Sequence, residues 1–360
     1  MAIRMKDIAL DLGVSIVTIS KVLRNHSDIS EETRQRVLKR MRELNYQPNL
    51  AARALVTGRS YTIGLVVPDL VHSFFSEVAK GLSSVLRQHG YRLLISTSEE
   101  DPVLERGEID DLLARRVDAL IIASTQWTVE SFRRIEEREM PYVLIDRSFL
   151  GLPANFVGVD DVEVGRLATE HLISIGCRRI AHIRGPEVST AMGRLEGYRR
   201  ALARHGLEAP PAYVVYGKSI DDAGDVSGQE SMTLLLNLAT RPDAVFCYND
   251  PTAMGAMRAA LASGLRVPED VAVIGCGNFY YADLLQVPLS SIDQDSAGIG
   301  EQAAKLALSL MEVKSAPARP RSVLLQPKLV ARASTLGVQV PSRPLLSGLR
   351  RSVAVGDATP

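Results

Sequence analysis

Residues 5–23, with the sequence MKDIALDLGVSIVTISKVL, carry the pattern that decides the fold of the amino-terminal segment. Apolar residues recur at helical spacing on both sides of Gly13, a residue type at which a helix can end in the left-handed conformation. Ala9, Gly13 and Ile19 have the spacing of a helix-turn-helix. Ala9 lets two helices approach closely, Gly13 permits the tight turn, and Ile19 wedges between the helices. The pattern predicts two short helices packed across a turn.

The second predicted helix extends from about Ile16 to Leu23, and Ser15 is placed to cap its start. We expect its inward residues to be Ile19, Val22 and Leu23. Its outward residues would then be Ile16, Val17, Thr18, Ser20 and Lys21.

A third helix is predicted after Ser30, because Glu31 and Glu32 would occupy its first turn, where the helix dipole favours acids. Its buried stripe is expected to comprise Val37, Leu38, Met41 and Leu44. Three short helices in so few residues are typical of a minimal DNA-binding unit. A three-helix protein-interaction module fits the same pattern.

Residues 49–56 are predicted to form a capped helix of two turns. Isolated helices become marginal at about 12–15 residues, so this one should fray unless another molecule holds it. Residues 57–60, TGRS, are predicted to be a linker. Leu55 either contacts the body of the protein or acts as an apolar wedge that enters a DNA minor groove when the helix forms.

Charge is distributed unevenly along the chain. Lys+Arg and Asp+Glu number 42 each, yet residues 1–60 contain 11 basic and six acidic residues, a net charge of +5. The remaining 300 residues therefore carry −5. A basic head on an acidic body suggests that the head meets a polyanion, although a solvated helical surface explains the charge equally well.

From residue 61 the periodicity changes to short β-branched runs that alternate with helical stretches. Strands are predicted at 63–67, 92–96, 119–123, 142–146, 179–183, 213–216, 244–248 and 271–275. Helices are predicted at 75–88, 104–115, 129–138, 163–175, 194–204, 223–238, 252–262 and 298–312. Nearly continuous apolar strands indicate parallel sheets covered on both faces. Two successive sets of four strand–helix units predict two similar lobes.

Polar residues follow several of these strands. Asp69, Asp146 and Asn249-Asp250 each come directly after a strand, and Gly277-Asn278 follows the last one. Ligands of such sheets bind at the carboxyl ends of the strands, so two facing lobes would share one cleft. Each residue could instead cap the next helix, and Asp250, which precedes Pro251, is most easily explained that way.

The sequence gives little support to other classes of protein. No apolar run approaches the roughly 18–20 residues that cross a bilayer, and the start of the chain has no apolar signal core. Cys177, Cys247 and Cys276 form neither a zinc pattern nor a disulfide framework, which suits a cytoplasmic protein. Gly275-Cys276-Gly277 lacks the third glycine of a dinucleotide-binding loop, so we expect no cofactor and no enzyme. A plain sugar-binding protein would lack the basic head.

Taken together, the motifs resemble the lactose/galactose-repressor (LacI/GalR) family of bacterial transcription regulators. The resemblance covers about residues 2–335 and rests on these stretches in family order: 5–9 MKDIA, 13–15 GVS, 30–34 SEETR, 45–49 NYQPN, 52–55 ARAL, 63–68 IGLVVP, 194–198 RLEGY, 249–250 ND and 264–271 GLRVPEDV.

The resemblance implies a small all-α helix-turn-helix headpiece at 1–48, a hinge helix and linker at 49–60, and an effector-binding core at 61–340. The core would resemble a periplasmic binding protein, with two α/β lobes whose sheets are parallel. The chain would cross between lobes near Asp160, Ile292 and Gln326. Lobe one would then comprise about 61–160 and 293–325, and lobe two about 161–291 and 327–340. Residues 341–360 lack periodicity and are expected to be a mobile tail.

The resemblance also implies DNA contacts. Ile16 and Val17 match the positions that choose bases, and their apolar side chains could touch thymine methyl groups. Lys21 stands where the family often has arginine, so readout of guanine should be looser. Leu55 matches the hinge leucine that inserts at the operator centre. The remaining candidates for DNA contact are Ser15, Thr18, Ser20, Asn25, Asn49 and Arg53.

Effector contacts carry over less completely. The matching candidates are Phe75, Asp146, Arg194, Asn249 and Asn278, of which Arg194 suits a hydroxylated or anionic ligand or else a structural ion pair. Gly277 stands where the family often has an aspartate, and Ser219 where it often has an aromatic residue. Trp127 could replace the lost stacking surface or lie at the lip of the cleft. The expected partners are double-stranded operator DNA, a small effector such as a sugar derivative, and a second copy of the chain in a homodimer or higher oligomer. Such a protein would act in the bacterial cytoplasm, on the nucleoid when bound to DNA.

Overall fold

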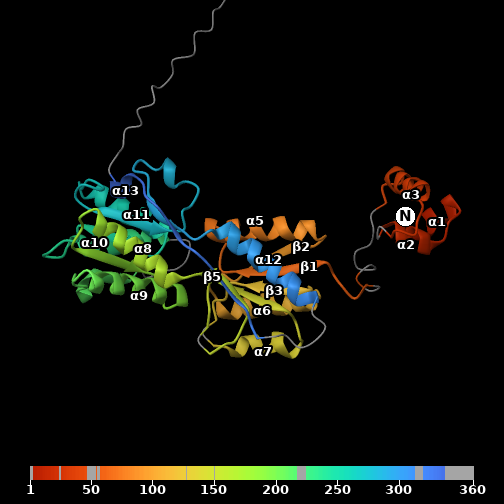
Figure 1. Ribbon diagram of the computed structural model, residues 1–360, viewed down its shortest axis with the longest axis horizontal. Coiled ribbons are helices and arrows are strands. Elements are labelled where there is room, and N and C mark those ends of the chain that lie inside the picture. Colours follow the sequence, from red (N-terminus) through yellow and green to blue (C-terminus); the bar gives the residue numbers. More distant parts are fainter. Residues whose placement is uncertain are drawn as a thin grey trace, which may run out of the picture.

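The structure is a computed structural model that describes residues 3–23, 26–46, 54, 57–126, 128–149, 151–216, 224–312 and 319–336. Figure 1 shows a small helical headpiece, followed along the chain by two α/β lobes, each built on its own sheet. Among the described residues, no helix is long and apolar enough to cross a membrane.

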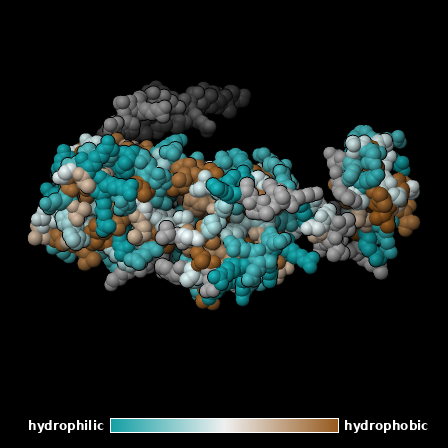
Figure 2. Space-filling view, turned by 60° about the horizontal axis from the view of Figure 1, so that its bottom comes forward, coloured by the Kyte–Doolittle hydropathy of each residue, from teal (hydrophilic) through white to brown (hydrophobic). Residues whose placement is uncertain are grey.

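The headpiece contains α1 (Met5–Leu12), α2 (Ile16–Leu23) and α3 (Glu31–Glu43). Gly13 ends α1 with φ 67°, and Ala9 and Ile19 are buried between the helices, as the helix-turn-helix spacing predicts. The small core comprises Ile8, Ala9, Ile19, Val22, Val37 and Met41. Leu23 was expected to point inward, but as the last residue of α2 it is 38 % exposed. Apolar residues also reach the headpiece surface, which carries hydrophobic patches in Figure 2.

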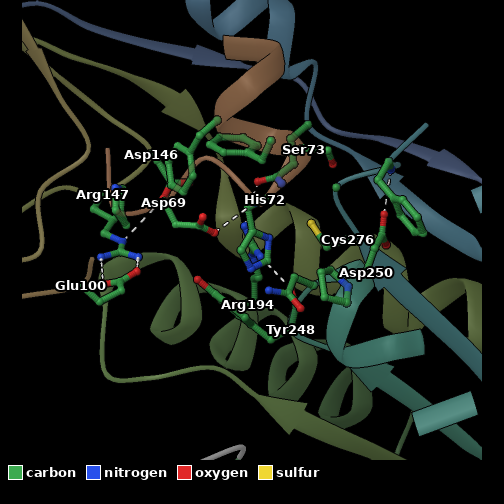
Figure 3. Close-up of a pocket in the computed structure, with 18 residues that line it drawn as sticks. Asp69, His72, Ser73, Glu100, Asp146, Arg147, Arg194, Tyr248, Asp250 and Cys276 are labelled. Atoms are coloured by element: carbon green, nitrogen blue, oxygen red, sulfur yellow. Dashed lines mark hydrogen bonds and ion pairs between the residues drawn. The ribbon is translucent and has the colours of Figure 1, made fainter. Parts of the chain in front are cut away.

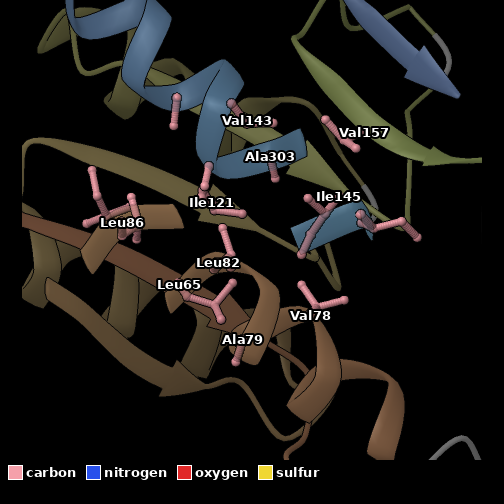
Figure 4. Packing of buried hydrophobic residues seen from close by; sticks show 14 of the residues in the cluster. Leu65, Val78, Ala79, Leu82, Leu86, Ile121, Val143, Ile145, Val157 and Ala303 are labelled. Atoms are coloured by element: carbon pink, nitrogen blue, oxygen red, sulfur yellow. The ribbon is translucent and has the colours of Figure 1, made fainter. Parts of the chain in front are cut away.

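The first sheet has six parallel strands in the order β11-β5-β4-β3-β1-β2. They are β1 (Thr62–Val67), β2 (Arg92–Thr97), β3 (Ala119–Ile122), β4 (Tyr142–Ile145), β5 (Phe156–Val159) and β11 (Ser322–Leu325). One face is covered by α5 (Ser73–Gln88) and α12 (Ser296–Glu312), whose apolar residues pack on the central strands (Figure 4). The other face is covered by α6 (Pro102–Ala114) and α7 (Glu130–Glu137).

The second sheet has the order β12-β10-β9-β8-β6-β7, in which β12 alone is antiparallel to its neighbour. Its strands are β6 (Ile180–Arg184), β7 (Val214–Tyr216), β8 (Ala244–Cys247), β9 (Ala272–Cys276), β10 (Ser290–Asp293) and β12 (Lys328–Val330). The helices around it are α8 (Asp161–Ser174), α9 (Ser189–Arg204), α10 (Gly224–Leu236), α11 (Asp250–Ala262) and α13 (Ala333–Leu336), with short 3-10 turns at Pro211–Tyr213 and Ala282–Leu284.

Four strands were not predicted from the sequence: β5, β10, β11 and β12. They are three or four residues long and lack a continuous apolar run, since β5 contains a glycine and β10 reads SSID. β11 and β12 lie at sheet edges and stay partly exposed. The chain passes between the two sheets from β5 to α8, from β10 to α12, and from β11 to β12. These strands are therefore defined by their sheet partners more than by local sequence.

Glycines allow unusually close contact between α8 and α9. A Cβ atom at Gly165 on α8 would lie 2.0 Å from the backbone oxygen of Arg194 on α9. A Cβ atom at Gly197 on α9 would lie 2.0 Å from the backbone oxygen of Val162 on α8. This reciprocal contact fixes Arg194 relative to the start of α8, where Asp161 lies.

Candidate functional site

The first candidate surface is the outward face of α2. The Ser15 hydroxyl accepts the backbone N–H of Thr18 at 3.0 Å and caps the helix as predicted. Its oxygen also lies 2.9 Å from the Thr18 hydroxyl, so in the unbound protein these two groups satisfy each other. Ile16 and Val17 are 49 % and 62 % exposed, which leaves both apolar side chains available for contact.

Lys21 lies on the same helix and donates a hydrogen bond to the Asp28 carboxylate. This hydrogen bond lowers the pKa of Asp28. This ion pair was not predicted from the sequence, because Lys21 lies in the last turn of α2 and Asp28 follows it by seven residues, beyond helical spacing. Ser20 is half-buried, and Asn25, Asn49, Arg53 and Leu55 lie outside the described residues.

The second candidate site is a cavity of about 690 Å³, counted with the solvent at its mouth, between the carboxyl ends of the two sheets. Figure 3 shows side chains of both lobes gathered around it. The first lobe contributes Pro68, Asp69, His72, Ser73, Phe74, Phe75, Glu100, Asp146 and Arg147; Arg194, Tyr248, Asn249, Asp250, Pro251, Cys276, Gly277, Phe279 and Gln294 come from the second lobe and its connection.

Arg194 is buried on α9, and three of its five N–H groups have acceptors. Its Nε donates to Asp161 Oδ1 at 2.9 Å, its Nη1 to the backbone oxygen of Tyr248 at 2.7 Å, and its Nη2 to Gln294 Oε1 at 2.8 Å. The guanidinium also lies 4.7 Å from the centre of the Tyr248 ring. Burial raises the pKa of Asp161 to about 7, against the opposing effect of the Arg194 charge. Arg194 thus forms a structural ion pair and lines the cavity as well.

A second buried ion pair lies on the first lobe. The Arg147 guanidinium donates to both Glu100 oxygens, at 2.9 and 2.6 Å, and its side chain is only 5 % exposed. Glu100 adopts φ 55°, a left-handed conformation that costs energy for a residue other than glycine. Sequence reasoning missed both residues, because the two are 47 positions apart and only the fold pairs them.

Asp146 lies between these two ion pairs, directly after β4. Its nearest cationic atom is the Nε of Arg147, at 3.7 Å from Oδ2. Burial raises the pKa of the Asp146 carboxyl, against the opposing effect of the Arg147 and Arg194 charges. The backbone at Asp146 is left-handed, with φ 61°.

Asn249, and not Asp250, is the residue that caps α11. The Asn249 side chain caps α11 by accepting the backbone N–H of Thr252 at 2.9 Å. Asp250 is buried instead, and its carboxylate accepts from the Ser291 hydroxyl at 2.6 Å and the Phe279 backbone N–H at 2.9 Å. Burial raises the pKa of Asp250 to about 6. The interpretation of Asp250 as a helix cap was therefore wrong, because Asn249 already occupies the capping position.

Phe75, Asp146, Arg194 and Asn249 all line the cavity, whereas Asn278 is not among the lining residues. The Asn278 amide instead accepts from Arg332 at 2.7 Å and donates to Asp293 at 3.1 Å. Gly277 has φ 128°, a backbone conformation that glycine adopts readily and aspartate does not. Trp127 and Ser219 lie outside the described residues.

The residues that line this cavity favour ligand binding over catalysis. Burial raises the pKa of the Cys276 thiol to about 12, so it is a poor nucleophile at neutral pH. No group of three or more potential metal ligands occurs in the part of the chain that the structure describes.

Comparisons with known proteins agree with this architecture. Residues 4–49 match the model of bacterial regulatory proteins of the lacI family, and residues 169–335 match that of the periplasmic binding protein-like domain. The chain is 33 % identical to the HTH-type transcriptional repressor CytR of Escherichia coli K12 over 93 % of this chain and 96 % of the repressor. It is 35 % identical to the ribose operon repressor of the same organism, over 83 % of this chain and 90 % of that repressor.

Among solved structures, the lac repressor dimer bound to operator and the anti-inducer ONPF superimposes with a TM-score of 0.82 at 29 % identity, covering 93 % of this chain and all of that one. The complex of the transcriptional regulator CelR with cellobiose superimposes with a TM-score of 0.69 at 31 % sequence identity. The match covers 92 % of this chain and 99 % of that one. The named relatives are transcriptional repressors and not enzymes, which confirms the expectation of a non-enzymatic regulator. With its helix-turn-helix headpiece and two-lobed core, the chain belongs to the lacI family of bacterial regulatory proteins.

Proposed function

We propose that this protein is a repressor that binds a near-palindromic operator as a homodimer and responds to a small polar effector, such as a sugar derivative, in the cleft between its lobes. The observation that carries this proposal is the presence, in one chain, of an exposed α2 face and a cavity walled by both sheets. The similar lac repressor was solved as a dimer on its operator, and the ribose operon repressor is named for a sugar operon.

The headpiece would read DNA mainly through Ile16 and Val17, whose exposed side chains suit thymine methyl groups. Lys21 must leave Asp28, or share it, before it can contact a base or phosphate. Ser15, Thr18, Ser20 and Asn25 would position the helix on the phosphates, which fixes register without reading sequence. Leu55, with Asn49 and Arg53 in the hinge segment, would act at the operator centre.

Effector control would run from the cleft to the hinge. Asp146 belongs to the first lobe and Asn249 to the second, so a ligand that touches both should favour the closed arrangement. Closure in a dimer would move the two hinge segments, residues 49–60, relative to each other. Coupling of this kind usually amounts to about 1–3 kcal/mol, and it requires that operator DNA change effector affinity by the same factor.

The first test is operator binding by the full chain. Fluorescence anisotropy on operators selected from random DNA should show two protomers per palindromic site. Affinity should fall with salt by a log–log slope of about −0.9 for each neutralised phosphate. A chain that lacks residues 1–60 should lose this binding and still unfold cooperatively. Binding that ignores salt, or one protomer per site, would contradict the proposal.

A second test concerns base selection by Lys21. A lysine is a point charge and lacks the planar fork of arginine, so Lys21→Arg should sharpen preference at one base pair per half-site and Lys21→Ala should relax it. Selection from a random DNA pool measures both effects. Lys39→Ala, which removes the same charge from the exposed side of α3, is the matched control and should leave the selected motif unchanged. An identical motif for the parent and both Lys21 variants would make Lys21 a phosphate contact only.

A further inference from the structure

The cavity between the lobes is lined by more acidic than basic side chains. The cavity wall contains the carboxylates of Asp69, Glu100, Asp146 and Asp250 but only two guanidinium groups. Both guanidiniums are engaged, Arg147 by Glu100 and Arg194 by Asp161. An anionic ligand would therefore meet more carboxylates than guanidinium groups, and both guanidinium groups are already paired with acids.

Asp146 differs from the other carboxylates of the cavity wall in its hydrogen bonding. Asp250 accepts from Ser291 and Phe279, and Asp69 accepts backbone N–H groups of Val71 and His72. Within the described residues, by contrast, no donor hydrogen-bonds to the Asp146 side chain, although that side chain is only 12 % exposed. Arg147 Nε lies 3.7 Å from Asp146 Oδ2, and this buried donor itself has no acceptor among the described residues. The Asp146 carboxylate thus lacks a hydrogen-bond donor and Arg147 Nε lacks an acceptor, and a ligand could supply both.

The backbone gives no reason for an acid at this position. With φ 61°, residue 146 is left-handed, a conformation in which asparagine fits at least as well as aspartate. Asparagine would also avoid the cost of a buried charge. The negative charge is therefore the property that sets aspartate apart here.

We propose that the cleft takes a small hydroxylated ligand that carries one protonated amine, with the ammonium group against the Asp146 carboxylate and a hydroxyl oxygen beside Arg147 Nε. This inference rests on the proposed role of the cleft as the effector site. The aromatic wall residues Phe74, Phe75 and Phe279 suit such a ligand, because ring faces attract cations and cover its apolar parts. The raised pKa of Asp146 agrees with it, since an ammonium group would restore the ionised carboxylate.

Ligand sets that differ in one functional group test the proposal on the full chain. We would measure thermal shifts with D-glucosamine, D-glucose and D-glucose 6-phosphate, and with tris(hydroxymethyl)aminomethane against its neutral analogue 1,1,1-tris(hydroxymethyl)ethane. In at least one set the amine should bind about tenfold or more tightly than its neutral partner, as one desolvated charge contact predicts. The phosphate should bind weakest. The absence of any amine-selective shift across these sets would overturn the proposal.

Two variants test the proposal through their stability without ligand and through their response to the amine. Asp146→Asn should raise the Tm by about 2–4 °C, because it removes the cost of burying a charge, and should abolish the amine-selective shift. Glu100→Gln is the matched control, because it neutralises a carboxylate that is already paired with Arg147, and it should lower the Tm. A lower Tm for Asp146→Asn, or retention of the amine shift, would refute the inference.

The outcomes also separate this inference from the proposed function. If a neutral or anionic compound binds the cleft and changes operator affinity, the effector site stands and the amine assignment fails. If an amine binds through Asp146 and operator affinity stays constant, the amine assignment stands and allosteric control fails.

Discussion

Arg194→Ala is expected to lower the free energy of unfolding of the core by about 3 kcal/mol, because it leaves the buried Asp161 carboxylate unpaired. The same change removes the donors to the Tyr248 backbone oxygen and to Gln294, which hold the cleft wall together. We therefore expect the response to effector to disappear while operator binding by the headpiece is nearly intact. Urea unfolding at pH 8 and anisotropy with operator DNA measure the two effects.

A double variant shows whether the loss comes from the ion pair. Asp161→Asn in the Arg194→Ala background removes the unpaired charge and should recover part of the lost stability. If the double variant is as unstable as the sum of the two single variants, Arg194 stabilises the core by packing and not by pairing. An Arg194→Ala protein that still responds to effector like the parent would show that the cleft is not the effector site.

Gly165→Ala is expected to lower the free energy of unfolding by roughly 2–3 kcal/mol, the upper part of the range for overpacking, although it adds a single methyl group. That methyl carbon would lie 2.0 Å from the backbone oxygen of Arg194, so α8 and α9 must move apart. Because α9 carries Arg194 and α8 begins with Asp161, the shift should also weaken effector binding. Guanidinium unfolding and effector titration measure these changes.

Gly107→Ala is the matched control for this effect. Gly107 lies on the exposed side of α6, and a Cβ atom there would meet no other atom within 4 Å. Alanine should therefore stabilise the protein by about 0.5–1 kcal/mol through helix propensity alone. If both variants change stability in the same direction, the close contact between α8 and α9 does not control the effect of Gly165→Ala.

The headpiece shows how much of a fold can be predicted from local sequence. Ala9, Gly13 and Ile19 predict two helices and their contact, because helical periodicity and a left-handed turn residue are properties of neighbouring positions. The central strands of both sheets were equally predictable, since their continuous apolar runs fit only a covered parallel sheet. Leu23 was misplaced because burial at a helix end depends on what the rest of the fold places opposite it.

The cleft shows what the tertiary structure alone decided. Residue types and resemblance identified Phe75, Asp146, Arg194 and Asn249, which the fold places around one cavity. Sequence could not find their partners: Arg194 meets Asp161 from 33 positions away, and Asn278 turns from the cavity toward Arg332, 54 positions away. Strands β5, β10, β11 and β12 follow the same rule, because sheet partners define them. Periodicity thus determined which segments form helices and central strands. Long-range pairing of charges and strands, which periodicity does not encode, decided which carboxylate in the cleft was left without a hydrogen-bond donor.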